Sequence, residues 1–148
     1  MKHRLFLDAN VLVSVLLKEY PSYTWSARLL SMAERPTLEL VTTPVVIAIA
    51  YYFSEKKHGT AQALQRIARL TEHLSICPVN EYHVNAALKH SKPVDLEDAI
   101  QYHAAIDYGC TLLVTENKAD FWYSEIPVMI AQEALSHLTA DSASRMGD

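Results

Sequence analysis

The stretch Arg4-Leu5-Phe6-Leu7-Asp8-Ala9-Asn10 decides the fold, because a short apolar run ends abruptly at a carboxylate. The apolar residues before Asp8 predict a buried strand. The residues that follow, from Val11 to Lys18, predict a helix with Asn10 as its N-cap. A strand that leads directly into a helix is the opening unit of a parallel sheet.

The same alternation continues along the chain and predicts an α/β fold. Thr43 and Pro44 favour a helix start, and Gly59 and Gly109 favour helix ends. The expected architecture is a three-layer α/β/α sandwich with a central parallel sheet, in one domain of residues 1–138, followed by a polar tail (139–148) that we expect to fray. Further strands are predicted at 38–41, 74–77, 111–114 and 128–130, and further helices at 23–33, 44–57, 60–72, 81–89, 95–108 and 132–138.

Composition narrows the class of protein. The 148 residues are half apolar, and no apolar run is long enough to span a bilayer. Cys77 and Cys110 each stand alone in an apolar setting, which predicts free thiols in a reducing compartment and a cytoplasmic location. The formal charge of −4 means that a polyanionic substrate would need a local basic patch or a bound cation.

Acidic and amide side chains follow the predicted strands or begin a predicted helix. Asp8 ends the first strand, Asp95 and Asp98 share one face of a helix start, and Asn117 and Asp120 follow the strand 111–114. Each group has an ordinary structural explanation: helix capping, the helix dipole or turn formation. We expect Glu97 to point elsewhere, into solvent.

These groups should nevertheless meet, because ligand sites of parallel sheets lie at the carboxyl ends of the strands. Carboxylates gathered in one cleft repel one another, and a hard cation such as Mg²⁺ or Mn²⁺ removes that conflict. Such a cation would also bridge the acidic site to a phosphate and activate a water. Zinc is not expected, since the histidines form no metal-binding motif, and we interpret His103 as structural.

Three motifs in this order resemble the PIN-domain family. They are Leu7-Asp8-Ala9-Asn10-Val11-Leu12, Asp95-Leu96-Glu97-Asp98-Ala99 and Thr115-Glu116-Asn117-Lys118-Ala119-Asp120-Phe121. The resemblance implies a PIN-like fold and a Mg²⁺- or Mn²⁺-dependent endoribonuclease, often dimeric and often the toxin of a toxin–antitoxin pair. It further implies a catalytic set of Asp8, Asp95, Asp98, Asn117 and Asp120, of which Asp8, Asp98 and Asp120 hold the metal. The partners it implies are an RNA substrate, an antitoxin protein and a second copy of the chain, with no membrane.

One position departs from the family pattern. Many PIN domains carry a glutamate on the helix after the second strand, and this chain has Ile49, or Ala48, at that place. The neighbouring cluster Tyr51-Tyr52-Phe53 is expected in the core or at a dimer surface rather than as a base-stacking platform. Two alternatives to the nuclease therefore stay open: a PIN-like RNA- or protein-binding module without activity, and a phosphoryl-transfer enzyme with Asp8 as nucleophile, which would need a lysine such as Lys118.

Overall fold

A parallel five-stranded sheet with the strand order β3-β2-β1-β4-β5 forms the centre of the fold. The computed structural model describes residues 3–146, and side chains as far as residue 141. The strands are β1 (His3–Leu7), β2 (Leu38–Thr42), β3 (Ser75–Ile76), β4 (Leu112–Val114) and β5 (Val128–Met129). Every pair of neighbouring strands is parallel, which confirms the predicted α/β class.

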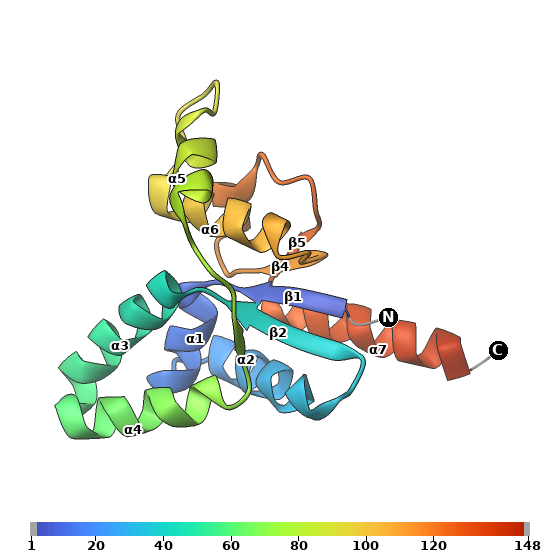
Figure 1. The fold of residues 1–148 in the computed structure, drawn as a ribbon. Helices are drawn as coiled ribbons and strands as arrows, with labels where there is room; N and C mark the ends of the chain where they lie inside the picture. Colours follow the sequence, from blue (N-terminus) through green and yellow to red (C-terminus); the bar gives the residue numbers. More distant parts are fainter. Residues whose placement is uncertain (1–2, 147–148) are drawn as a thin grey trace.

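Helices cover both faces of this sheet. In Figure 1, α1 (Ala9–Leu16), α2 (Ser22–Ser31), α3 (Pro44–His58) and α4 (Thr60–Thr71) lie on one side of the strands. The other side carries α5 (Glu81–Leu88) and α6 (Leu96–Asp107), which pack on each other. The three-layer sandwich is therefore confirmed. Two short 3₁₀ helices, η1 (Met32–Glu34) and η2 (Lys118–Phe121), complete the connections.

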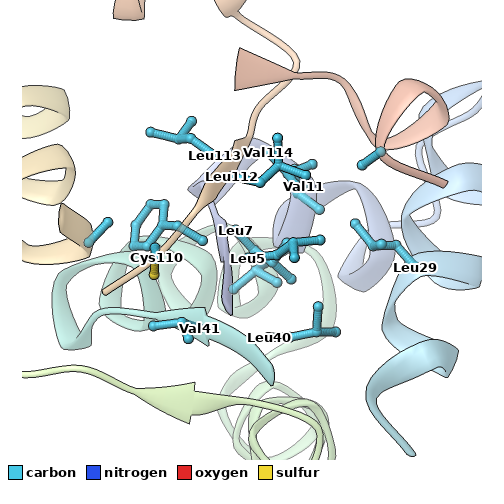
Figure 2. Close-up of a cluster of buried hydrophobic side chains, with 14 of the residues drawn as sticks. Leu5, Leu7, Val11, Leu29, Leu40, Val41, Cys110, Leu112, Leu113 and Val114 are labelled. Atoms are coloured by element: carbon cyan, nitrogen blue, oxygen red, sulfur yellow. The ribbon is translucent and has the colours of Figure 1, made fainter. Parts of the chain in front are cut away.

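Apolar side chains between the layers form the core shown in Figure 2, which brings together β1, β2, β4 and the adjoining helices. The central strands are buried on both faces, as expected for a parallel sheet covered by helices. Arg4 near the start of β1 is partly exposed and pairs with Glu39, whereas Leu5, Phe6 and Leu7 are at most 1% exposed. Asp8 is the first charged residue after this buried stretch.

Two boundaries differ from the prediction. Asp8 rather than Asn10 is the N-cap of α1, so this helix begins at Ala9. The last helix, α7 (Ala131–Met146), packs on α2 and continues beyond the predicted end at Leu138. Residues 139–146 are thus helical where the sequence predicted a frayed polar tail, and residues 147–148 lie outside the described part.

The register of the sheet places the site. Leu7 pairs with Val114 across β1 and β4, and Phe6 pairs with Val41 across β1 and β2. Asp8 and Thr115 therefore leave the sheet at the same edge, beside the end of β2. Among the described residues, no helix is long and apolar enough to cross a membrane.

Candidate active site

Asp8 is a buried carboxylate at the carboxyl end of the central strand. Its side chain is 5% exposed and is held by two hydrogen bonds. The Ala9 backbone N–H donates to Oδ1 at 2.8 Å, and the Thr115 hydroxyl donates to Oδ2 at 2.9 Å. Burial raises the pKa of Asp8, while these hydrogen bonds oppose the shift. Asp8 is therefore the N-cap of α1 and also a buried carboxylate in a fixed orientation. Capping the helix and serving as a metal ligand are compatible roles for this side chain.

A polar network joins the ends of β1 and β4. The Asn10 amide donates to the Thr115 hydroxyl at 3.1 Å and accepts from the Glu116 N–H at 3.1 Å. The Asn117 N–H also donates to the Thr115 hydroxyl, at 3.1 Å. Sequence reasoning assigned no site role to Asn10 or Thr115. The signal was present, since both stand one or two residues from a predicted site residue, but their pairing requires the register of β1 on β4.

The start of α6 supplies the second group of carboxylates. Asp95 is the N-cap, and its Oδ1 accepts from the Asp98 N–H at 2.9 Å. Asp98 lies deeper, and burial together with the charges of Asp8, Asp95, Asp120 and Glu97 raises its pKa to about 7. Glu97 lines the same cleft as Asp98, and burial and its acidic neighbours raise its pKa as well. Glu97 is exposed, as expected, but the expectation that it points away from the site was wrong.

The loop after β4 supplies the third group. Asn117 lines the cleft, while Asp120 lies on η2 and does not. The Asp120 charge nevertheless raises the pKa of both Asp8 and Asp98, which places it within electrostatic reach. All five predicted site residues thus gather at one edge of the sheet. Asp8, Asp98 and Asn117 border the cleft, and Asp95 and Asp120 act on it by charge.

The cleft itself has a volume of about 400 Å³ and a mixed lining. Its acidic and amide side chains are those of Asp8, Asn10, Glu19, Glu97, Asp98 and Asn117. Ile49 and Phe53 of α3 are among its apolar side chains. Such a lining offers both charged and apolar contacts to a ligand.

Similarity to known proteins agrees with this geometry. Residues 4–119 match the PIN domain family. The chain belongs to this family. Ribonuclease VapC1 of Aquifex aeolicus (strain VF5) is 27% identical over 136 residues, which cover 88% of this chain and 92% of the relative.

Solved structures of low sequence identity share the PIN fold. VapBC-1 from nontypeable Haemophilus influenzae matches with a TM-score of 0.68 at 19% identity, covering 87% of this chain and 98% of that chain. VapC20 of Mycobacterium tuberculosis, described as a sarcin-ricin loop cleaving toxin, matches with a TM-score of 0.59 at 15% identity, covering 74% and 86%. These likenesses extend over most of the domain and establish its architecture.

The departure of this PIN domain at α3 is visible in the cleft. Ile49 lines it, as the alignment to the usual glutamate predicted, whereas Ala48 does not. The three aromatic residues of the cluster Tyr51-Tyr52-Phe53 have different surroundings. Phe53 also lines the cleft, whereas Tyr51 hydrogen-bonds Glu55 and Tyr52 lies near Lys56. Phe53 is 43% exposed and borders the site, so it does not lie in the core, and its place at a dimer surface stays a prediction.

PIN nucleases generally depend on a divalent metal ion, and the donor set here has the right chemistry for one. Burial and neighbouring carboxylates raise the pKa of Asp8 and Asp98, and a hard cation would remove this repulsion. Among the described residues, no three His, Cys, Asp or Glu side chains already stand in a metal-binding cluster. The metal set Asp8, Asp98 and Asp120 therefore stays a prediction, which the action of the Asp8 and Asp120 charges on Asp98 supports.

Two other predicted roles find their place in the structure. Lys118 binds Glu133, with Nζ to Oε1 at 2.9 Å, so it is engaged away from Asp8. This contact weighs against the phosphoryl-transfer alternative. His103 lies outside the lining of the cleft, with its Nε2 2.9 Å from that of His90, and burial lowers its pKa. Its surroundings fit the structural role that the sequence suggested.

Proposed function

We propose that this PIN domain is a divalent-metal-dependent endoribonuclease that hydrolyses phosphodiester bonds of RNA. The observation that carries the proposal is the gathering of Asp8, Asp98 and Asn117 in one cleft, with the charges of Asp95 and Asp120 acting on it. The similarity over most of the chain to a relative named ribonuclease VapC1 supports the same activity.

Each side chain has a role that follows from its position. A bound Mg²⁺ or Mn²⁺ would polarise the RNA phosphate and activate a water molecule. Asp8 would offer it an oriented oxygen, because two hydrogen bonds fix that carboxylate. Asp98 and Asp120 would complete the acidic ligands, and the Asn117 amide would face the phosphate. Asp95 holds the first turn of α6, and with it the backbone of Asp98, in place.

The partners that we propose are an antitoxin protein and a second copy of the chain. VapBC2 from Rickettsia felis, a structure described as bound to a DNA fragment from the promoter, supports a toxin role within a toxin–antitoxin pair. Apolar side chains left exposed on α3 and α5 support a homodimer. They are Val45, Tyr52 and Phe53 on α3, and Tyr82, Val84 and Leu88 on α5.

Cys77 and Cys110 are free and buried, which is in keeping with a cytoplasmic protein.

The direct test is RNA cleavage by the purified chain with Mg²⁺, Mn²⁺ or EDTA. We expect cleavage only with the metal, and its loss in Asp98→Asn. A matched control is Glu81→Gln, which also removes a carboxylate from the first turn of a helix, α5, but outside the cleft. Cleavage that survives in EDTA, or equally in Asp98→Asn and Glu81→Gln, would show that another protein or another site cuts the RNA.

One observation favours a second function, that of a binding module. Ile49 stands in the cleft where many relatives have a glutamate, so the site has one carboxylate fewer to hold a cation. A protein that retains RNA but never cuts it in millimolar Mn²⁺ would be such a module. Parallel binding and cleavage measurements on the same RNA separate the two functions.

A further inference from the structure

An exposed tryptophan follows the segment that carries Asp120, outside the lining of the cleft itself. Trp122 is 57% exposed, although tryptophan is a side chain that folding usually covers. It directly follows η2, two residues after Asp120, whose charge acts on Asp8 and Asp98. Two residues span at most roughly 7 Å, so the Trp122 backbone lies within that distance of the Asp120 backbone. Burial and the charges of Asp98 and Asp95 raise the pKa of the neighbouring Tyr123, which places this segment within electrostatic reach of the acidic group.

A lysine reaches this tryptophan from the other acidic element. The Lys92 Nζ lies 6.0 Å from the centroid of the Trp122 ring. Lys92 precedes Asp95 by three residues, so its backbone lies within roughly 11 Å of that of the α6 cap. A cation–π contact of this length is at the limit of the usual range, so it keeps the ammonium near the ring without occupying it fully. Among the described side chains, no carboxylate pairs with Lys92.

An aromatic cluster supports the Trp122 ring from inside. Tyr123 packs edge-on against it, with ring centroids 5.4 Å apart. Tyr123 in turn packs against His90 at 4.7 Å and Tyr102 at 5.2 Å. A ring held in this way loses little conformational freedom when a ligand stacks on it, which is the property of a binding platform.

Charge indicates which ligand this platform would take. The adjoining cleft is lined by Asp8, Glu97 and Asp98, and the whole chain has a formal charge of −4, so a polyanion needs a cationic contact at the edge of the cleft. Lys92 is such a contact, and it stands next to an aromatic surface. Unpaired RNA bases stack on aromatic side chains while nearby cations bind the backbone.

We propose that Trp122 and Lys92 form a nucleotide platform, on which an unpaired base of the RNA stacks against Trp122 while Lys92 contacts a neighbouring phosphate. This inference rests on the proposed ribonuclease function and names the residues that position its substrate. It requires a substrate that is single-stranded next to the cleavage site. Neither residue is in the metal set, so their substitution should affect RNA binding and leave the reacting groups in place.

Kinetics on a single-stranded RNA test the platform. Stacking on one aromatic ring contributes about 1–3 kcal/mol per base, so Trp122→Ala should raise KM by roughly 5- to 150-fold with little change in kcat. Trp122→Phe keeps a ring and should lose less. Lys92→Ala should lower the slope of log affinity against log salt by about 0.7, the value for one phosphate contact on a single strand.

A second aromatic–cation pair provides the matched control. Trp25 lies under Arg28 on α2, with the guanidinium 5.4 Å from the ring centroid, and both line a groove against α7 instead of the acidic cleft. Trp25→Phe should leave KM unchanged. It also leaves Trp122 as the only tryptophan of the chain, so that its fluorescence reports directly on stacking.

Fluorescence separates failure of the platform from failure of the proposed activity. In the Trp25→Phe, Asp98→Asn protein with EDTA, oligoribonucleotide should quench Trp122 even though nothing is cut. Quenching in a chain that never cleaves RNA would support the platform and overturn the ribonuclease. Normal cleavage with an unchanged KM in Trp122→Ala and no quenching would overturn the platform and leave the ribonuclease intact. Loss of self-association or antitoxin binding in Trp122→Ala, with RNA binding intact, would assign the surface to a protein partner and overturn the inference.

Discussion

Replacing Asp98 by asparagine should make the metal-free protein more stable near neutral pH. The pKa of this carboxyl is about 7 in the folded chain, against an ordinary 3.8, because of burial and the charges around it. The folded state therefore binds a proton that the unfolded state has released. Stability from this group is complete below pH 3.8 and is lost as the pH rises to about 7. Asparagine has no such charge and avoids the loss.

The size of the gain follows from two opposing effects. Without screening, the rise in the pKa of Asp98 would cost about 4 kcal/mol in the free energy of unfolding above pH 7. Asp98 is only half-buried, and screening by solvent reduces this cost to about 1–2 kcal/mol. A carboxylate in the first turn of α6 also gains about 0.3–1 kcal/mol from the helix dipole, which the variant gives up. The repulsion between carboxylates outweighs the dipole, so the variant should gain about 1 kcal/mol, or about 2–4 °C in Tm.

The measurement is thermal unfolding in EDTA at pH 5 and pH 8. Asp98→Asn should exceed the wild type at pH 8, and the difference should shrink at pH 5. Glu81→Gln serves again as the control, since it loses a first-turn carboxylate of α5 without relieving any repulsion in the cleft. With Mn²⁺ the order should reverse, because metal bound to the folded state stabilises the wild type by mass action, about 2.7 kcal/mol at a hundredfold excess over Kd.

If the Tm of Asp98→Asn at pH 8 in EDTA were as low as that of the control Glu81→Gln, this expectation would be refuted. That result would mean that the carboxylate is well solvated and that its acidic neighbours do not act on it. A wild type whose Tm does not respond to millimolar Mn²⁺ would separately refute the metal site.

Three further changes test the individual side chains. Ile49→Glu adds a carboxylate to the lining of the cleft and should tighten Mn²⁺ binding, measured by calorimetry. No gain in a folded variant would mean that another residue supplies that ligand. Asp95→Asn should only weaken RNA cleavage where Asp98→Asn removes it, since Asp95 is an exposed cap; equal loss would show that the pair acts as a unit. Thr115→Val removes a hydrogen bond that lowers the pKa of Asp8, so the cleavage rate should rise at a higher pH than in the wild type. An unchanged pH profile would contradict that bond.

Local sequence was enough to predict the fold and the edge on which the site lies. β1, β2 and β4 each end at or just before a polar residue, and the parallel arrangement follows from the alternation of strands and helices. Asp8, Asp98 and Asn117 could be assigned to one cleft on that basis, and the resemblance to PIN domains aligned Ile49 with it. The helix after β5 was predicted too short, because a polar stretch such as 139–146 carries little apolar periodicity.

Contacts between distant segments were decided only by the tertiary structure. The bond from Thr115 to Asp8 joins residues 107 positions apart and depends on how β4 registers on β1. Glu97 was misassigned because helical spacing tells which residues share a face but not how wide a cleft that face meets. The raised pKa of Asp98 has the same origin, since it arises from burial and from carboxylates at the end of β1, at the start of α6 and on η2. Electrostatic coupling and desolvation depend on distances through space, and those distances exist only once the sheet has brought the three segments together.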